Sequence, residues 1–158
     1  MTEAAMPTME DLYPGGAGYH QAHEPYIRAV ADALTASGVK VLNWYADPND
    51  PRDGAIRVNT FGLDYDEVWV CWQEERRWYV LLIEEHEGRE PSRWVRDLDA
   101  GTVFSPESVV RAFADHMGIT ADPPGDSFPD LDWPEHTFED DNIPLELALR
   151  RYAEGGPR

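Results

Sequence analysis

Glu84 and His86 are the residues whose spacing best suits acid–base catalysis. They stand two positions apart at the end of an apolar run, so in a strand both side chains point to the same face of the sheet. A carboxylate beside an imidazole orients the ring and favours its protonated form, as a proton-transfer pair requires. Polar residues also commonly end a strand where it leaves the core, and this structural interpretation is the stronger one. We therefore expect no catalytic residues. If the chain is an enzyme, Glu84 and His86 are the candidates.

Two further patterns resemble metal sites but lack the full set of ligands. His20-x-x-His23 places two imidazoles on one face of a helix, whereas a zinc site needs three or four ligands. The loop DPNDPRDG (47–54) resembles a calcium loop, but Pro51 replaces a ligand and Arg52 replaces the required glycine. We expect two surface histidines and an ordinary turn, with no metal and no cofactor. The sequence motifs of serine hydrolases, P-loop NTPases, dinucleotide-binding proteins and zinc proteases are absent.

The strongest signal for recognition of another macromolecule is the acidic segment 119–142, which holds four prolines and eight acidic residues. Isolated aromatic residues in such a segment can dock on a partner while the carboxylates meet a basic surface. The candidate partner-binding residues are Phe128, Asp130, Leu131, Asp132, Trp133, Phe138, Glu139, Asp140 and Asp141. The alternative, that the segment wraps its own domain and its aromatic residues patch the core, stays open.

The charge of the chain restricts the partners it can have. Its 158 residues include 31 acidic and 13 basic ones, which gives a formal net charge of −18. Nucleic acids and anionic bilayers repel such a chain, so we expect no direct binding to either and a protein partner with a basic surface. The N-terminus lacks the basic flank and apolar stretch of a secretory signal. Cys71, the only cysteine, lies in the apolar run VWVCW, which is typical of a buried thiol in the cytoplasm.

Apolar periodicity predicts the elements that position these residues. Helices are expected over 24–37, 105–117 and 143–153, and strands over 39–46, 55–61, 67–73, 77–86 and 92–98. The short connections favour antiparallel pairing. Both faces of the 77–86 strand are apolar, which predicts a central strand that is covered on two sides.

These elements predict an α+β fold: an antiparallel sheet of four to five strands flanked by an N-terminal and a C-terminal helix, then an acidic, proline-rich tail with a short helix. The expected divisions are a flexible N-terminal segment (1–22), an α+β domain (23–118), and an acidic connector with a C-terminal helix (119–158). That last helix would return the chain to the domain or mediate self-association.

Three stretches of the chain resemble one family of small uncharacterised actinobacterial proteins, a domain of unknown function. They are PYIRAVADAL (25–34), VWVCWQEERRWYVLLIEE (68–85) and SPESVVRAFADHMG (105–118), so the resemblance covers roughly residues 25–118. Matches to the family pattern are Tyr26, Arg28, Ala29, Val30 and Trp78. The resemblance implies an actinobacterial source and a cytosolic setting but no activity. The order of helix, sheet and helix is also similar to that of acidic secretion chaperones and their sensory-regulator relatives, which are often dimeric.

We therefore expect a non-enzymatic, cytosolic protein-binding or regulatory module, of adaptor or chaperone type, which uses its acidic surface and tail. Two alternatives remain: an immunity protein or nucleic-acid-mimicking inhibitor of a basic partner, and an enzyme with a nonstandard site near the end of the 77–86 strand. A homodimer is also open. If the tail only captures a partner, deletion of residues 119–158 leaves a folded body; if the tail is structural, the truncated chain aggregates.

Overall fold

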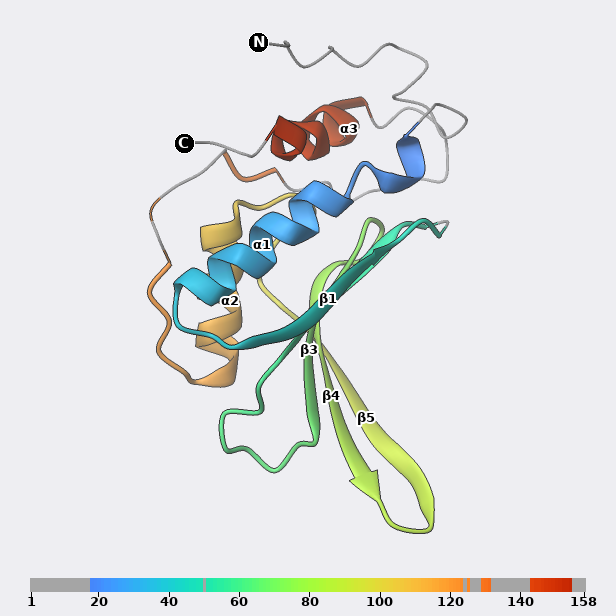
Figure 1. The fold of residues 1–158 in the computed structure, drawn as a ribbon, viewed down its shortest axis with the longest axis vertical. Coiled ribbons are helices and arrows are strands. Elements are labelled where there is room, and N and C mark those ends of the chain that lie inside the picture. Colours follow the sequence, from blue (N-terminus) through green and yellow to red (C-terminus); the bar gives the residue numbers. More distant parts are fainter. Residues whose placement is uncertain (1–17, 50, 124, 126–128, 132–142, 155–158) are drawn as a thin grey trace.

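The computed structural model describes residues 18–49, 51–123, 125, 129–131 and 143–154. They form a five-stranded antiparallel sheet with three α-helices, which confirms the predicted α+β class (Figure 1). In chain order the elements are η2 (Tyr19–Gln21), α1 (Glu24–Ala36), β1 (Val41–Asp47), β2 (Asp53–Val58), β3 (Glu67–Gln73), β4 (Arg77–His86), β5 (Arg89–Asp97), α2 (Pro106–Met117), α3 (Ile143–Arg150) and η3 (Arg151–Glu154).

Helix α1 is held on the sheet by one apolar face. Tyr26, Ile27, Val30 and Leu34 recur at helical spacing, and all four are fully buried. Helix α1 packs so closely on β2 that a Cβ atom on Gly54 would lie 2.9 Å from the Ile27 Cγ1 atom. Glycine at this position therefore sets how closely α1 can pack on the sheet.

The strands follow one another across the sheet in chain order, so each connection is a hairpin or a short loop. β3 pairs with β4 over the whole length of β3, from Glu67 opposite Ile83 to Gln73 opposite Arg77. β5 is an edge strand, and with β4 it forms a long hairpin that projects away from the helices (Figure 1).

Helices α1 and α2 lie on one side of the sheet, and the sheet residues that face them form the core (Figure 1). Trp78, Val80 and Leu82 of β4 are buried on this side. Tyr79 and Leu81 point to the other side and stay partly exposed. The prediction of cover on both sides is therefore wrong for the described residues, because the apolar character of a strand does not reveal whether a second layer exists.

Helix α3 returns the chain to the body. It contacts α1, and its residues Leu145, Ala148 and Leu149, together with Tyr152 of η3, belong to the same core as α1 and the sheet. Of the predicted flexible segment, residues 1–17 lie outside the described residues, and Tyr19–Gln21 forms the 3-10 turn η2. In the part of the chain that the structure describes, no helix has the length and apolar character needed to cross a membrane.

Candidate functional site

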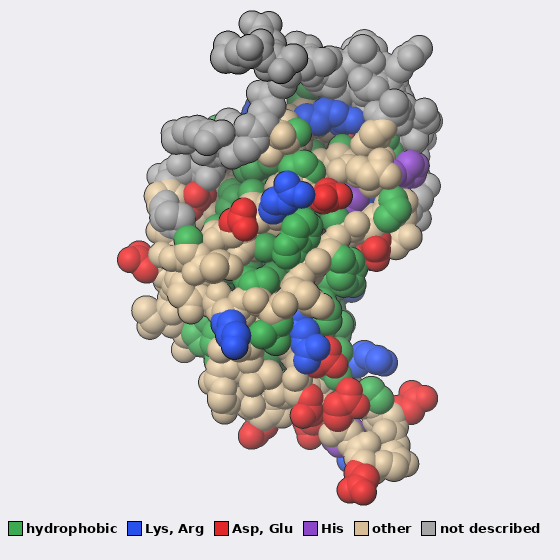
Figure 2. Space-filling view, viewed as in Figure 1, with side chains coloured by type: hydrophobic (Ala, Val, Ile, Leu, Met, Phe, Trp, Pro, Cys, Tyr) green, Lys and Arg blue, Asp and Glu red, His purple; other side chains and the backbone are tan. Residues whose placement is uncertain are grey.

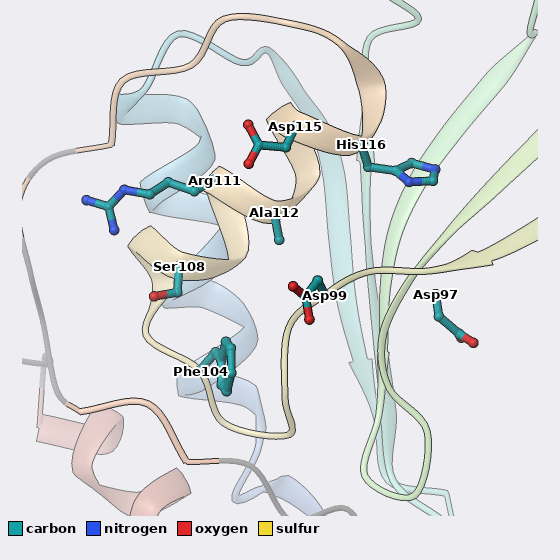
Figure 3. Close-up of a pocket in the computed structure, with 8 residues that line it drawn as sticks. All are labelled: Asp97, Asp99, Phe104, Ser108, Arg111, Ala112, Asp115 and His116. Atoms are coloured by element: carbon teal, nitrogen blue, oxygen red, sulfur yellow. The ribbon is translucent and has the colours of Figure 1, made fainter.

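A groove of about 520 Å³ runs between α2 and the segment that joins β5 to α2. We call it the α2 groove (Figure 3). One wall comes from the exposed side of α2, and the other comes from the end of β5 and the connection that follows it. The groove is lined by Asp97, Asp99, Phe104, Ser108, Arg111, Ala112, Asp115 and His116.

The sequence of α2 explains why this side of the helix faces outward. Ser105 caps the first turn, since its Oγ accepts a hydrogen bond from the Ser108 backbone N–H at 3.2 Å, and Pro106 occupies the first turn without losing a hydrogen bond. Val109 and Phe113 turn into the core and are fully buried. The residues on the opposite side of the helix are thereby left to line the groove.

The α2 groove combines a small apolar surface with carboxylates. Asp99 lies between the helix and the end of β5, across from Ala112, and Arg111 extends to the other side of the helix (Figure 3). Asp97 pairs with Arg76 at 3.4 Å, whereas Asp99 and Asp115 are exposed to solvent. A lysine or arginine side chain fits such a site, because its aliphatic stem packs on apolar surface while its cationic head meets carboxylates.

Two of the predicted partner-binding residues, Asp130 and Leu131, lie at the beginning of α2. The Asp130 carboxylate accepts hydrogen bonds from the Ser105 N–H at 2.7 Å and the Ser108 hydroxyl at 3.1 Å. Leu131 exchanges two backbone hydrogen bonds with Val103, of 2.8 and 3.1 Å. The acidic segment is thus attached to its own domain beside the α2 groove. The other candidates, Phe128, Asp132, Trp133, Phe138, Glu139, Asp140 and Asp141, lie outside the described residues.

Glu84 and His86 lie together at the end of β4, where the sheet register shifts. The Glu84 carboxylate is 3.9 Å from the His86 Nδ1 atom. The His86 Nε2 atom forms a hydrogen bond of 2.8 Å with the Ser92 hydroxyl, and Arg89 lies 3.3 Å from Nδ1. Both ring nitrogens are therefore engaged by neighbouring side chains, an arrangement that braces the β4–β5 hairpin.

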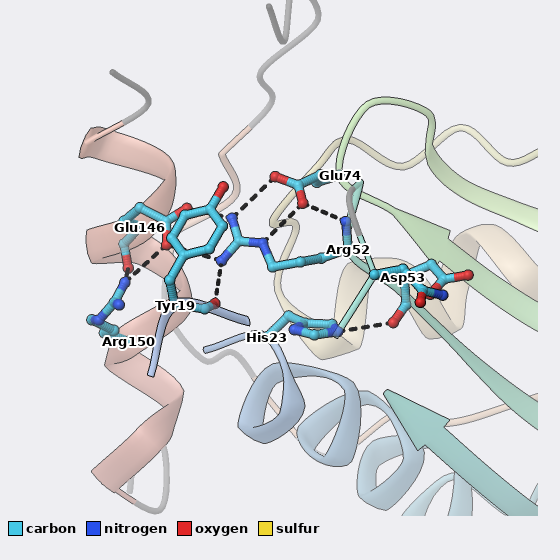
Figure 4. Close-up of polar contacts among 8 residues, drawn as sticks. Tyr19, His23, Arg52, Asp53, Glu74, Glu146 and Arg150 are labelled. Carbon is cyan, nitrogen blue, oxygen red and sulfur yellow. Dashed lines mark hydrogen bonds and ion pairs between the residues drawn. The ribbon is translucent and has the colours of Figure 1, made fainter. Parts of the chain in front are cut away.

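A buried group of charges ties α3 to the sheet. We call it the Arg52 cluster; it comprises Tyr19, Arg52, Glu74, Glu146 and Arg150 (Figure 4). The Arg52 guanidinium donates to both oxygens of Glu74, at 2.9 and 3.0 Å, and to both oxygens of Glu146. It also lies 3.9 Å from the Tyr19 ring, and the Tyr19 carbonyl accepts a further hydrogen bond of 2.9 Å.

Arg52 stays charged although its side chain is fully buried. Burial alone would lower the pKa of Arg52, but the hydrogen bonds and charges of Glu146 and Glu74 more than offset this and raise it. Two carboxylates therefore depend on one guanidinium, with Arg150 adding a second cation 2.9 Å from Glu146. All three nitrogens of the Arg52 guanidinium donate to neighbouring groups, so the Arg52 cluster stabilises the packing of α3 on the sheet.

His23 corrects the prediction of two surface histidines, because it is fully buried. Its ring stacks on Trp72 with centroids 5.6 Å apart, and its Nε2 atom forms a hydrogen bond of 2.9 Å with the Asp53 carbonyl. Burial, followed by the charge of Arg52, lowers the pKa of His23. Among the described residues, no group of three or more potential ligands is placed to hold a metal ion.

The lowered pKa of His23 predicts a specific pH dependence of stability. Because the unfolded state binds the proton more readily, the free energy of unfolding should fall as the pH drops below about 6.5, by up to about 1.4 kcal/mol per pH unit. The loss should cease below the lowered pKa of the folded state. Urea denaturation between pH 8 and pH 5 measures this pH dependence. The difference in free energy of unfolding between wild type and His23→Asn, followed across the same range, isolates the contribution of His23.

The matched control for this measurement is His116→Asn, because His116 is exposed at the end of α2. This variant removes an imidazole from an exposed position, and it therefore shows how the loss of a histidine that is not buried affects the same measurement. A parallel pH dependence of wild type and His23→Asn would contradict the burial of a neutral imidazole.

Reasoning from the sequence missed both the α2 groove and the Arg52 cluster. One signal was present in the closing helix: Glu146 stands beside Leu145 and Leu149, on the apolar side, where a carboxylate needs a buried partner. No comparable signal marked Arg52, which lies in a stretch typical of an exposed turn. The groove arises from two elements that meet only in the folded chain.

The chain was compared with known proteins. The sequence model of a family of unknown function, DUF6292, matches residues 26–115, which is more than half of the chain. No curated protein and no solved structure matches. The matched segment contains most of α1, the whole sheet and most of α2, and it ends before α3.

Proposed function

Because the chain belongs to DUF6292, a family of unknown function, we propose its function from its geometry: it is a protein-binding module that holds a basic segment of a partner protein in the α2 groove. The observation that carries this proposal is the exposure of Asp99 and Asp115 in one groove, beside the apolar surface of Ala112 and Phe104. A regulatory role, a cytoplasmic location and an actinobacterial source belong to the same proposal.

Electrostatics support a basic partner over a small neutral ligand. A net charge of −18 raises the local concentration of cationic segments and accelerates their encounter with the chain. Asp130 extends the acidic surface from the groove to the beginning of α2. The acidic segment that continues from there would prolong the contact along the partner.

The alternative functions have less support in the described residues. An inhibitor that mimics a nucleic acid needs a continuous negative stripe. Acidic side chains do gather over the β4–β5 hairpin (Figure 2), but Arg89, Arg93 and Arg96 interrupt them along β5. An enzyme would need reactive groups at the end of β4, where His86 is already held by Ser92.

Removal of two carboxylates from the α2 groove should weaken peptide binding. The probe is a fluorescein-labelled peptide that alternates lysine with alanine, and the measurement is fluorescence anisotropy with the full chain. For Asp99→Asn/Asp115→Asn we expect an affinity at least about tenfold lower, since two partly exposed charge pairs contribute about 1.4 kcal/mol. Binding should also weaken as salt increases from about 20 to 300 mM.

A matched variant separates the groove from the overall charge. Glu87→Gln/Glu90→Gln removes the same two charges from exposed positions of the β4–β5 hairpin, far from α2 (Figure 1). This variant should bind the peptide within about twofold of wild type, because only the long-range field changes. Equal losses in both variants would show that net charge, and not the groove, attracts the peptide and would refute the proposal.

A further inference from the structure

The side of the sheet that faces away from the helices carries an apolar strip, and we call this side the open face. Strand alternation and register place the strip across the sheet. It consists of Tyr45, Trp69, Cys71, Tyr79, Leu81 and Val95. At its two ends Tyr45 is 43% exposed and Val95 is 45% exposed. Aromatic residues that remain uncovered on a flat surface are typical of the centre of a protein interface.

The charges around the strip are nearly balanced, unlike those of the whole chain. Four arginines and five carboxylates belong to the open face: Arg57, Arg76, Arg77, Arg93, Asp47, Asp53, Glu67, Glu85 and Asp97. Several lie against the strip, with the Arg76 guanidinium 4.5 Å from the centre of the Tyr79 ring and the Arg57 guanidinium 6.0 Å from that of Trp69. Four positive and five negative charges leave a formal charge of −1 on this face, although the chain as a whole carries −18.

We propose that the open face binds the open face of a second copy of this chain, in a two-fold symmetric dimer. Two molecules of charge −18 repel each other, so a self-contact is favoured where the local charge is close to zero. In a two-fold contact the same surface meets itself, which allows the arginines of one copy to approach the carboxylates of the other. A strongly basic partner, in contrast, gains no electrostatic advantage from this face.

The size of the open face predicts a weak but specific dimer. Five strands about 4.8 Å apart and four rows of side chains about 6.8 Å apart span roughly 20 by 20 Å. Two such faces packed together bury roughly 800 Å² in total, which is below the range of about 1,200–2,000 Å² for stable interfaces and in the range of weak, transient ones. We therefore expect a micromolar dissociation constant. Helix α2 lies on the other side of the sheet, so of the residues that line the groove only Asp97 also belongs to the open face (Figure 1).

Sedimentation velocity of the full chain tests the proposal, at concentrations from about 1 to 500 µM, which bracket a micromolar constant. Wild type should shift from monomer to dimer over this range. Val95→Lys places a charge on the strip and should weaken the dimer at least tenfold. The control is Leu147→Lys, at a position of α3 that is 43% exposed, and it should dimerise as wild type does.

Two results would overturn the proposal: a wild-type chain that stays monomeric at every concentration, or a Leu147→Lys variant that dissociates as readily as Val95→Lys. If far-UV circular dichroism shows that Val95→Lys is unfolded, Tyr45→Lys, on the opposite edge of the sheet, provides the same test. Peptide binding in the α2 groove is measured separately, so failure of the dimer leaves the proposed function to its own experiment.

Discussion

Replacement of Arg52 by methionine should lower the free energy of unfolding by about 3–5 kcal/mol, because it leaves two buried carboxylates without their shared cation. Glu74 and Glu146 are both fully enclosed, and each directs both of its oxygens at the Arg52 guanidinium. Urea denaturation at pH 7, followed by tryptophan fluorescence and circular dichroism, measures the loss.

Two further variants separate the burial of charge from the loss of a side chain. Arg28→Met breaks an exposed pair with Glu24 on α1 and should cost less than about 0.5 kcal/mol. The triple variant Arg52→Met/Glu74→Leu/Glu146→Leu removes all three charges and should recover most of the stability lost in Arg52→Met. If Arg52→Met lowered the free energy of unfolding no more than Arg28→Met, the Arg52 cluster would not be the buried network of charges that this structure describes.

Truncation of the chain after residue 142 should abolish the folded state. It removes Leu145, Leu149 and Tyr152 from the core, and each such side chain contributes about 1.5–3 kcal/mol through burial. The sum, about 5–9 kcal/mol, is comparable to the total stability of a small domain. The truncation also takes away Glu146 and uncovers Arg52. Far-UV circular dichroism and gel filtration should show an unfolded or aggregated chain.

Single substitutions in α3 provide the control that a truncation lacks. Leu149 is fully buried and Leu147, two positions earlier, is 43% exposed. Leu149→Ala should lower the free energy of unfolding by about 2–5 kcal/mol, and Leu147→Ala should lower it by less than about 0.5 kcal/mol. Similar effects of the two, together with a truncated chain that stays folded, would favour the interpretation of the tail as an appendage for partner capture.

The residues in these two predictions lie both inside and outside the segment that matches the family. Arg52 and Glu74 lie within the matched segment 26–115, whereas Glu146 and the apolar residues of α3 follow it. The segment that matches the family therefore does not contain its whole core. In this chain, α3 supplies both an apolar cover for α1 and the second carboxylate for Arg52.

Secondary structure was predicted best where its signal is local. The strands over 67–73 and 77–86 have the predicted bounds, and α2, at Pro106–Met117, begins one residue after the predicted start. The β2 strand begins earlier than predicted, because Asp53 and Gly54 have the composition of a turn but pair with Gln73 and Trp72. Strand pairing across the sheet overrides the local preference of those two residues.

The amino-acid sequence was sufficient for properties that depend on neighbouring residues or on sums: the order of the elements, their antiparallel pairing, the −18 charge and the burial of Cys71. Folding in three dimensions settled which polar residues are buried. Arg52 finds Glu146 at a separation of 94 residues, and no periodicity carries information across that distance. The open face arises in the same way, because its five strands come together only when the chain packs. The α2 groove is more local, since all its lining residues lie between Asp97 and His116, but it forms only where the connection after β5 lies beside α2. A buried charge is stable only if its partner is held in place, and that condition belongs to the packed structure and not to any local stretch of the chain.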